Sequence, residues 1–379
     1  MPSGEHMLMV DADGHVMEPV DLWENYIDPE YRDRAIKLEH DKDGFEVLTF
    51  DGKPFEALRG KLAALGGIEM DTERLSTKGG MTYAEGCPPG GYDPAERIKV
   101  LDQEGVDISL MYPTIGICWE AHVRDPKLAT AYTRAYNRWI VEFCSHDRKR
   151  MVPVAHISLL DPEGAVEEVI RARKDGCVGI MLSPDMAARN GLHFDDPVFK
   201  PFWETVQDLD MPIAFHVVVR DQPSYHEWLH PKAPTGLFNF AFVAMDVMAA
   251  FTMFLSLGMF EMYPGVRLAV LETGANWIAA WLERLDHKYE VTPTKRLKIK
   301  PSDYFRRQCL VSADPDETMT AAVMDHIGAD YFIWASDYPH IDASMGVIPE
   351  LRRNVADLPE ANQRKIFGEN AKKFYRLSV

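Results

Sequence analysis

The chain has few cysteines, and they form no recognisable pattern. Five are scattered among 379 residues, from Cys87 to Cys309, without a CxxC pair. Clustered cysteine pairs mark structural zinc sites and redox motifs, and dense even sets mark disulfide frameworks, so both classes are excluded. Dispersed thiols in a long chain are typical of a reducing compartment. We therefore expect a cytoplasmic protein with unpaired cysteines.

The sequence also lacks an excess of positive charge. Its 59 acidic residues outnumber 41 basic ones, which gives a formal net charge of -18. This balance excludes a polyanion such as nucleic acid as the main partner. Residues 1–6 contain no basic segment that leads into an apolar run, so we expect no export. A small molecule is the expected ligand.

Long apolar runs are absent except for one stretch. Residues 237–260 are rich in methionine and nearly uncharged, which suits a membrane span by length. The stretch contains Asp246 and Asn239, and no lysine or arginine flanks it closely. We therefore favour a buried or interface helix and expect no membrane. Methionine suits adaptable packing surfaces. We therefore expect this helix either to contact a partner subunit in a homodimer or to line a substrate pocket.

Short apolar runs alternate with helical segments along most of the chain, which predicts parallel βαβ units. Eight such runs are present, at residues 7–10, 106–111, 151–155, 178–182, 211–215, 266–271, 309–312 and 331–336. Asp-Pro pairs, which favour helix starts, precede several helical segments; examples are Asp93-Pro94 and Asp314-Pro315. Eight units predict a closed (β/α)8 TIM barrel that forms a single domain over residues 1–379. A doubly wound sheet is the alternative, but residues 11–15 do not form its glycine-rich phosphate turn.

One long segment interrupts this alternation. Residues from about 20 to 92 lack strong periodicity and contain a predicted hairpin with Asp51-Gly52 as its turn. An insertion directly after the first strand is either a lid over a site or a peripheral flap. Extra helices follow the eighth strand, the last over residues 359–377.

Histidine and acidic side chains stand at the C-terminal ends of four predicted strands. They are Asp13 and His15 after the first strand, His216 after the fifth, Glu272 after the sixth and Asp337 after the eighth. Catalytic groups of a barrel come from these strand ends, and the first and eighth strands are neighbours. Such side chains bind Zn²⁺, Mn²⁺ or Fe²⁺. We predict one divalent cation there; the alternative is a set of unrelated core, loop and helix-cap residues.

Aromatic and histidine side chains near the other strand ends are candidates for substrate contact. These candidates are Tyr112, Trp119, His156, Trp228 and His340. Aromatic rings at the mouth of a barrel suit a flat substrate. Packing in the core explains the same residues nearly as well.

The segments that carry these residues resemble the amidohydrolase superfamily, and most closely the branch that includes aminocarboxymuconate-semialdehyde decarboxylase. The resemblance rests on residues 11–19, His216, residues 271–277 and residues 335–340, in that order, and residues 368–375 resemble the C-terminal helix of that branch. It implies a distorted (β/α)8 barrel with one catalytic divalent metal, often zinc. The implied ligands are His15, His216 and Asp337, with Asp13 as a further candidate.

Two positions differ from the family pattern. The family commonly has His-x-His where this chain has Asp13-Gly14-His15, and often a histidine where this chain has Glu272. In the decarboxylases that histidine is associated with acid–base work, so its replacement favours hydrolysis over decarboxylation. Glu272 is then a ligand, a base or a helix-end carboxylate.

The resemblance implies a metal-dependent hydrolase of a small organic acid, amide, ester or C–C bond. Metal-activated water would attack, and Asp337 would move the proton, with Glu272 as a second catalytic carboxylate. The alternative is a non-oxidative decarboxylase of an aromatic or unsaturated acid. A third hypothesis is a barrel that binds a ligand without catalysis.

Overall fold

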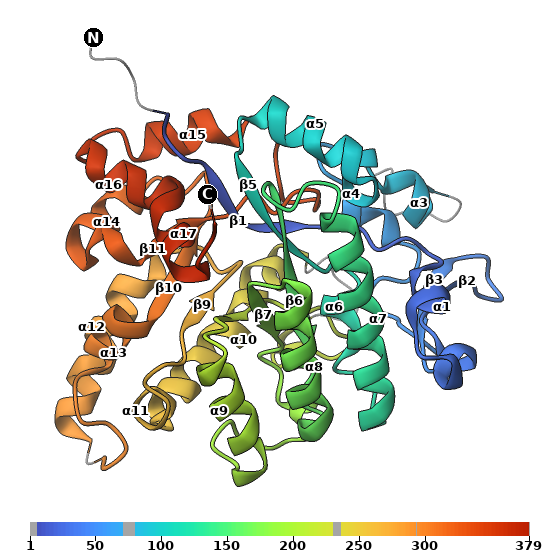
Figure 1. The fold of residues 1–379 in the computed structure, drawn as a ribbon, viewed down its shortest axis with the longest axis horizontal. Helices are drawn as coiled ribbons and strands as arrows, with labels where there is room; N and C mark the ends of the chain where they lie inside the picture. The colour runs from blue at the N-terminus through green and yellow to red at the C-terminus, as the bar shows by residue number, and fades with distance from the viewer. Residues whose placement is uncertain (1–5, 71–79, 230–235, 293, 379) are drawn as a thin grey trace.

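A ring of strands enclosed by helices organises the molecule (Figure 1). The computed structural model describes residues 6–70, 80–229, 236–292 and 294–378. Within these residues, the main sheet holds parallel strands in the order β1-β5-β6-β7-β8-β9-β10-β11. The strands are β1 (Val10–His15), β5 (Ile108–Tyr112), β6 (Met151–Ile157), β7 (Gly179–Leu182), β8 (Ile213–Phe215), β9 (Leu268–Val270), β10 (Cys309–Ala313) and β11 (Phe332–Trp334). The predicted (β/α)8 barrel is confirmed.

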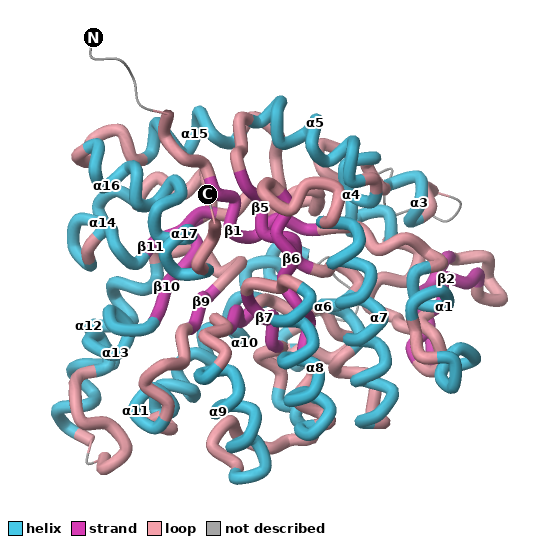
Figure 2. Tube along the Cα trace, viewed as in Figure 1, coloured by secondary structure: helices cyan, strands magenta, loops and turns pink. Residues whose placement is uncertain are grey.

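Helices form the outer layer, and the strands of the main sheet gather at the centre (Figure 2). Among the longer helices are α5 (Pro94–Glu104), α7 (Pro126–Cys144), α8 (Pro162–Asp175), α9 (Lys200–Asp208), α10 (Gly236–Ser256), α12 (Trp277–Val291), α13 (Pro301–Gln308), α14 (Thr320–Ile327) and α15 (Val347–Asn354). The shorter ones include α1 (Leu22–Tyr26), α3 (Tyr83–Gly86), α4 (Pro89–Tyr92), α6 (Gly116–Trp119), α11 (Met259–Met262), α16 (Glu360–Arg364) and α17 (Asn370–Tyr375). A π-helical turn, Lys365–Glu369, joins α16 to α17, which makes the predicted C-terminal helix nearly continuous.

The barrel closes where β1 meets the chain that follows β11. The Asp337 N–H donates to the Asp13 carbonyl at 3.1 Å, and the His15 N–H donates to the Tyr338 carbonyl at 2.8 Å. These bonds join the first and last strands at their C-terminal ends. Closure therefore brings residues more than 300 positions apart in sequence into one site.

The buried carboxylate of Asp11 reinforces this seam. It accepts hydrogen bonds from the Ser109 hydroxyl at 2.7 Å, the Ser336 hydroxyl at 2.8 Å and the Ser336 N–H at 3.0 Å. A Cβ at Gly14 would overlap both this carboxylate and the Ser109 hydroxyl, so the strand requires glycine there. Because side chains alternate between the two faces of a strand, Asp11 is predicted to point to the same face of β1 as Asp13. That prediction is wrong, because the pairing of β1 with β5 shifts between Asp11 and Gly14.

We expect Asp11→Asn to lower the free energy of unfolding by about 1–3 kcal/mol, because an amide nitrogen would face donors that now bond to a carboxylate. Urea denaturation measures this loss. Asp325→Asn, at an exposed position on α14, is the matched control because it removes the same charge. Equal stability of the two variants would contradict the role given to Asp11.

The insertion after β1 carries a small antiparallel sheet of its own. Its strands are β2 (Lys37–His40), β3 (Glu46–Phe50) and β4 (Lys53–Pro54). The predicted hairpin turn is confirmed, since Asp51 and Gly52 have positive φ angles of 52° and 70°. The strand β2 was not predicted, and residues 71–79 of the insertion lie outside the described residues.

The helix α10 has the composition that the sequence suggested. It spans 21 residues and is, among the described residues, the one helix long and apolar enough to cross a membrane, by length and composition only. Only 22% of its most apolar window is buried in the protein. Leu237 is 88% exposed and Phe240 is 59% exposed, so an apolar face of this helix is left uncovered.

Candidate active site

Strand ends far apart in sequence bring two imidazoles and two carboxylates together. The His15 Nε2 atom lies 3.0 Å from the His216 Nε2 atom and 3.5 Å from an oxygen of Asp13. Asp13 also lies 3.6 Å from the His216 Nε2 atom, and Asp337 lies 3.8 Å from the His15 Nε2 atom. Asp13, His15 and His216 are fully buried. The structure thus brings the four predicted metal ligands into one cluster.

The hydrogen bonds of the two imidazoles fix which nitrogen atoms face each other. The His15 Nδ1 atom bonds to the Pro113 carbonyl at 3.0 Å, and the His216 Nδ1 atom bonds to the Val217 carbonyl at 2.8 Å. A carbonyl only accepts, so each Nδ1 carries the proton and each Nε2 presents a lone pair. Burial lowers the pKa of His216 to about 3 and also lowers the pKa of His15, so both rings are neutral.

Two lone pairs 3.0 Å apart repel each other unless a cation lies between them. Neither carboxylate oxygen of Asp13 has a hydrogen-bond partner among the described residues, and neither does one oxygen of Asp337. Buried polar atoms are normally paired. Burial, followed by neighbouring carboxylates, raises the pKa of both Asp13 and Asp337. The donor set and its unpaired atoms therefore fit a divalent cation.

Glu272 lies beside this cluster. One of its carboxylate oxygens is 3.2 Å from the His216 Nε2 atom. The helix-end interpretation of Glu272 is wrong, because Glu317 accepts hydrogen bonds from the Ala275 N–H at 2.8 Å and the Asn276 N–H at 3.1 Å. Glu272 is left free to face the cluster.

Two of the carboxylates that line the cavity described below sit on strained backbone. Glu272 and Asp337 each have a φ of 52°, in the left-handed region that disfavours side chains. Such strain costs on the order of 1 kcal/mol per residue and is concentrated at functional sites. The fold therefore holds these two side chains in place at a cost in stability.

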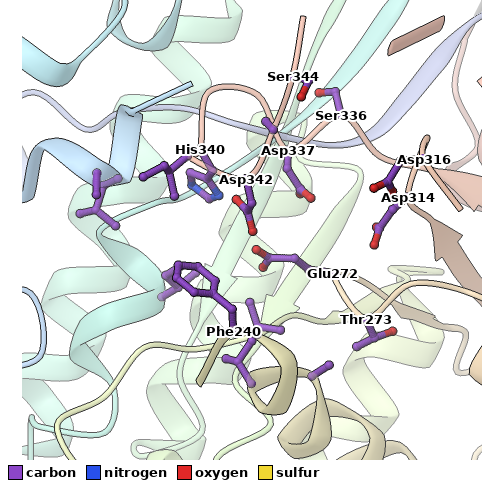
Figure 3. Close-up of a pocket in the computed structure, with 18 of the residues that line it drawn as sticks. Phe240, Glu272, Thr273, Asp314, Asp316, Ser336, Asp337, His340, Asp342 and Ser344 are labelled. Atoms are coloured by element: carbon purple, nitrogen blue, oxygen red, sulfur yellow. The ribbon is translucent and has the colours of Figure 1, made fainter. Parts of the chain in front are cut away.

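A cavity of about 530 Å³ opens above the cluster, a size that suits a small organic ligand. Figure 3 shows the carboxylates of Glu272, Asp337 and Asp342 converging on one space, with His340 at its edge. The apolar lining comes from several parts of the chain: Leu58, Ala64, Leu65, Ile117, Val217, Val219, Phe240 and Val243. Residues of the insertion thus form part of the wall.

Of the five candidates for substrate contact, His340 lines the cavity. Its ring lies 4.0 Å from the His15 ring, between centroids, and its Nε2 atom bonds to the Thr114 hydroxyl at 2.9 Å. Tyr112, Trp119 and His156 are fully buried and do not line this cavity in the described part of the chain.

The prediction that those three residues contact substrate is therefore wrong for this cavity. The reason is packing: the His156 ring lies against Trp119, and the Tyr112 hydroxyl lies 3.1 Å from the Tyr375 hydroxyl. Trp228 is 76% exposed and also does not line the cavity.

Sequence reasoning missed Asp314 and Asp342 in the cavity wall. Asp314 was interpreted as a helix cap from its Asp-Pro pair, but α14 begins only at Thr320. Their position in the sequence could have indicated this placement, because both aspartates lie in loops that follow predicted strands. Carboxylates in those loops lie at the mouth of a barrel.

Glu18 is a further residue that sequence reasoning missed. Its fully buried carboxylate accepts backbone hydrogen bonds from Thr114 at 3.2 Å, Ile115 at 2.8 Å and Gly116 at 3.1 Å. These bonds shape the loop that follows β5 and that supplies the Pro113 carbonyl to His15. Burial raises the pKa of Glu18 to about 7.

This pKa predicts a pH dependence of stability. Between its ordinary value of 4.5 and about 7, the folded protein keeps a proton on Glu18 that the unfolded chain releases. The contribution of Glu18 to stability therefore falls as pH rises through this window. Glu18→Gln should reduce the loss of unfolding free energy between about pH 5 and pH 7.5 by about 2 kcal/mol, measured by urea denaturation. Glu24→Gln, at an exposed position on α1, should leave the loss unchanged.

Comparison with known proteins identifies the family of the chain. A family model described as Amidohydrolase matches residues 86–377. The chain belongs to the amidohydrolase family. Gamma-resorcylate decarboxylase from Rhizobium radiobacter is 26% identical over 303 residues, which cover 74% of this chain and 86% of that protein. The Polaromonas protein of the same name is 27% identical, with 74% and 87% covered.

Solved structures share the fold. An amidohydrolase from Mycobacterium avium subsp. paratuberculosis has a TM-score of 0.80 at 20% identity, with 98% of this chain and 100% of that chain covered. The 5-carboxyvanillate decarboxylase from Sphingomonas paucimobilis has a TM-score of 0.67 at 18% identity, with 98% and 100% covered. A dihydroxybenzoic acid decarboxylase from Polaromonas, solved with manganese and 2-nitroresorcinol, has a TM-score of 0.62 at 19% identity, with 98% of each chain covered.

The predicted superfamily is therefore confirmed, and the protein is an enzyme of the amidohydrolase superfamily. Its curated relatives are named as decarboxylases of aromatic acids. These names support the decarboxylase alternative better than the hydrolase that the sequence favoured. Two of the solved structures that share the fold, the Polaromonas decarboxylase and a 5-carboxyvanillate decarboxylase from Novosphingobium aromaticivorans, contain bound manganese.

Proposed function

We propose that the protein is a metal-dependent, non-oxidative decarboxylase of an aromatic acid. One observation carries this proposal: the opposed Nε2 lone pairs of His15 and His216, framed by unpaired carboxylates, lie beside a cavity that Glu272 and Asp337 line. The cavity has room for one aromatic ring, and the cluster below it suits a cation that attracts a carboxylate. The curated relatives point to the same reaction class.

Asp13, His15, His216 and Asp337 would hold the cation. When bound, it supplies a positive charge that orients a carboxylate and draws electrons toward it. The protein residues position the ring and handle the proton. Loss of carbon dioxide breaks one C–C bond and leaves the electron pair on the ring carbon, which then takes a proton. Glu272 and Asp337 face the cavity and are placed to exchange that proton.

We propose a single Zn²⁺ ion as the native metal, with Mn²⁺ and Fe²⁺ as the competing ions. Two imidazoles suit Zn²⁺, whereas two carboxylates suit Mn²⁺. Elemental analysis of protein purified without added metal, followed by reconstitution of the stripped protein with each ion, identifies the active form. Activity with Mn²⁺ and none with Zn²⁺ would overturn the choice of zinc.

The reaction class is tested with 2,6-dihydroxybenzoate in deuterated, ¹⁸O-labelled water. We expect release of carbon dioxide, one deuterium on the product ring and no ¹⁸O in the ring product. Hydrolysis of an ester or amide panel with ¹⁸O incorporation, without carbon dioxide release from any aromatic acid, would replace decarboxylation by hydrolysis.

We also propose a homodimer that covers the exposed face of α10. A contiguous apolar surface on a protein of this charge marks a contact, and closed two-fold pairing is its commonest form. Leu237→Glu combined with Met253→Glu should convert a dimer to a monomer in sedimentation velocity. Val291→Glu, at an exposed apolar position on α12, should not. A monomeric wild-type protein would contradict the proposal.

Unpaired cysteines support a further proposal, that the protein is cytoplasmic. All five are free thiols in the structure. Reduced thiols are typical of the cytoplasm. Cell fractionation tests this location, and recovery in an exported or membrane fraction would contradict it.

A further inference from the structure

The charged residues that line the cavity carry one sign. The lining carboxylates are Glu272, Asp314, Asp316, Asp337, Asp342 and Glu350. In the described part of the chain, no lysine or arginine lines the cavity. Figure 3 shows Asp314 and Asp316 on one side of Glu272, and Asp342 on the other. Negative charge therefore surrounds the space above the cation cluster.

A divalent cation does not cancel this charge. Its two positive charges match the two carboxylates proposed to hold it, Asp13 and Asp337. Glu272 and the carboxylates farther up the cavity remain uncompensated by any described lining residue. Most of the rest of the wall is apolar, with Phe240 and Val243 from α10, Ile117 from α6 and Val217 from the loop after β8. Polar groups without a negative charge come from Asn239, Thr273, Ser336, His340 and Ser344.

The acidic side chains already act on one another. Burial, together with repulsion from Glu317, Asp316 and Asp342, raises the pKa of Asp314 to about 7. Among the described residues, the wall has no lysine or arginine to offer an additional anion. An anionic group that enters this space is therefore repelled, and the low-dielectric surroundings strengthen that repulsion.

We propose that the cavity selects aromatic acids whose only negative charge is the carboxylate held at the cation, and that it rejects acids with a second ring carboxylate. This inference rests on the proposed function, because it assumes that the cation holds one carboxylate of the substrate. It separates the two classes of acid named for the structural neighbours: 2,6-dihydroxybenzoate carries one carboxylate, and 5-carboxyvanillate carries two. The charge of the wall favours the first class.

Three ligands of one series test the selection on the metal-loaded protein. They are salicylate, salicylate with a carboxamide at ring position five, and salicylate with a carboxylate at that position. The carboxamide has the size of the carboxylate but no charge. By calorimetry we expect the carboxylate to bind at least about tenfold more weakly than the carboxamide. Equal affinity of these two ligands would overturn the proposal.

Charge removal gives a second, independent measurement. In Asp314→Asn combined with Asp342→Asn, the ratio of the two dissociation constants should fall by about threefold or more. Asp325→Asn, on the exposed face of α14, alters net charge but not the wall and should keep the wild-type ratio. An unchanged ratio in the double variant would overturn the proposal.

Carbon dioxide release separates this inference from the proposed function. Suppose that no acid is decarboxylated, but the salicylate with the second carboxylate still binds more weakly than the one with the carboxamide. The proposed decarboxylase function is then rejected, and the proposed charge selection is kept. Suppose instead that acids are decarboxylated and these two ligands bind with equal affinity. The proposed charge selection is then rejected, and the proposed decarboxylase function is kept.

Discussion

Asp337→Asn should fold normally and lose most of the activity, with kcat lower by about 10²–10⁴-fold. An amide cannot accept or return a proton, and it is a weak ligand for a divalent cation. Asp337 lies 3.8 Å from the His15 Nε2 atom and also lines the cavity, so both of its proposed roles would be lost. Steady-state kinetics with 2,6-dihydroxybenzoate, together with a thermal unfolding curve, measures the two effects separately.

The control for this experiment is Asp325→Asn, which removes one exposed carboxylate on α14. It should keep wild-type kinetics. Turnover of Asp337→Asn at the wild-type rate would remove Asp337 from the catalytic machinery. Loss of the unfolding transition would instead show that the Asp337 carboxylate is needed for folding.

His216→Ala should lower the amount of bound metal by about tenfold or more at limiting metal concentration, since losing even an outer-shell partner costs about 10–100-fold in metal affinity. The His216 Nε2 atom lies 3.0 Å from its His15 counterpart and 3.6 Å from Asp13, so it faces the other three proposed ligands. Elemental analysis after dialysis against a fixed metal concentration gives the occupancy.

His326→Ala is the matched control for His216→Ala. Its imidazole is 57% exposed and pairs with Glu283 on the surface, and it is not one of the proposed metal ligands. It should keep the wild-type metal content. Unchanged occupancy in His216→Ala would exclude His216 as a ligand, and the opposed lone pairs would then need another explanation.

The barrel could be predicted because two patterns recur along this chain: a histidine or an acidic residue after an apolar run, and an Asp-Pro pair before a helical segment. Apolar runs end in Asp13, His216 and Asp337, and parallel strands bring such ends to one rim. The same logic failed at Asp11, because an irregularity in the pairing of β1 with β5 turns that carboxylate toward Ser109 and Ser336. A one-residue shift in strand pairing leaves no clear signal in a sequence.

The lining of the cavity was harder to predict than its base. Side-chain type suggested Tyr112, Trp119 and His156 as substrate contacts, yet all three are covered by packing that involves distant residues such as Tyr375. Glu272 was a candidate for the N-terminal end of α12, but Glu317 accepts the Ala275 and Asn276 N–H groups there. Local patterns cannot tell which of two nearby carboxylates reaches a given helix end.

The choice between hydrolysis and decarboxylation also lay beyond the sequence. A cation held by His15 and His216 with two carboxylates serves either reaction, so the ligands do not discriminate. The glutamate at position 272 was interpreted as favouring hydrolysis because the family often has a histidine there. The structure places that carboxylate 3.2 Å from the His216 Nε2 atom, where it is available for proton transfer in either case.

Anomalous diffraction from crystals of the metal-loaded protein tests the central claim most directly. We predict a single strong peak between the two Nε2 atoms of His15 and His216, at about 2.0–2.3 Å from each and in contact with Asp13 and Asp337. A peak bound elsewhere, or an ordered site in which these side chains bond only to one another, would contradict the account.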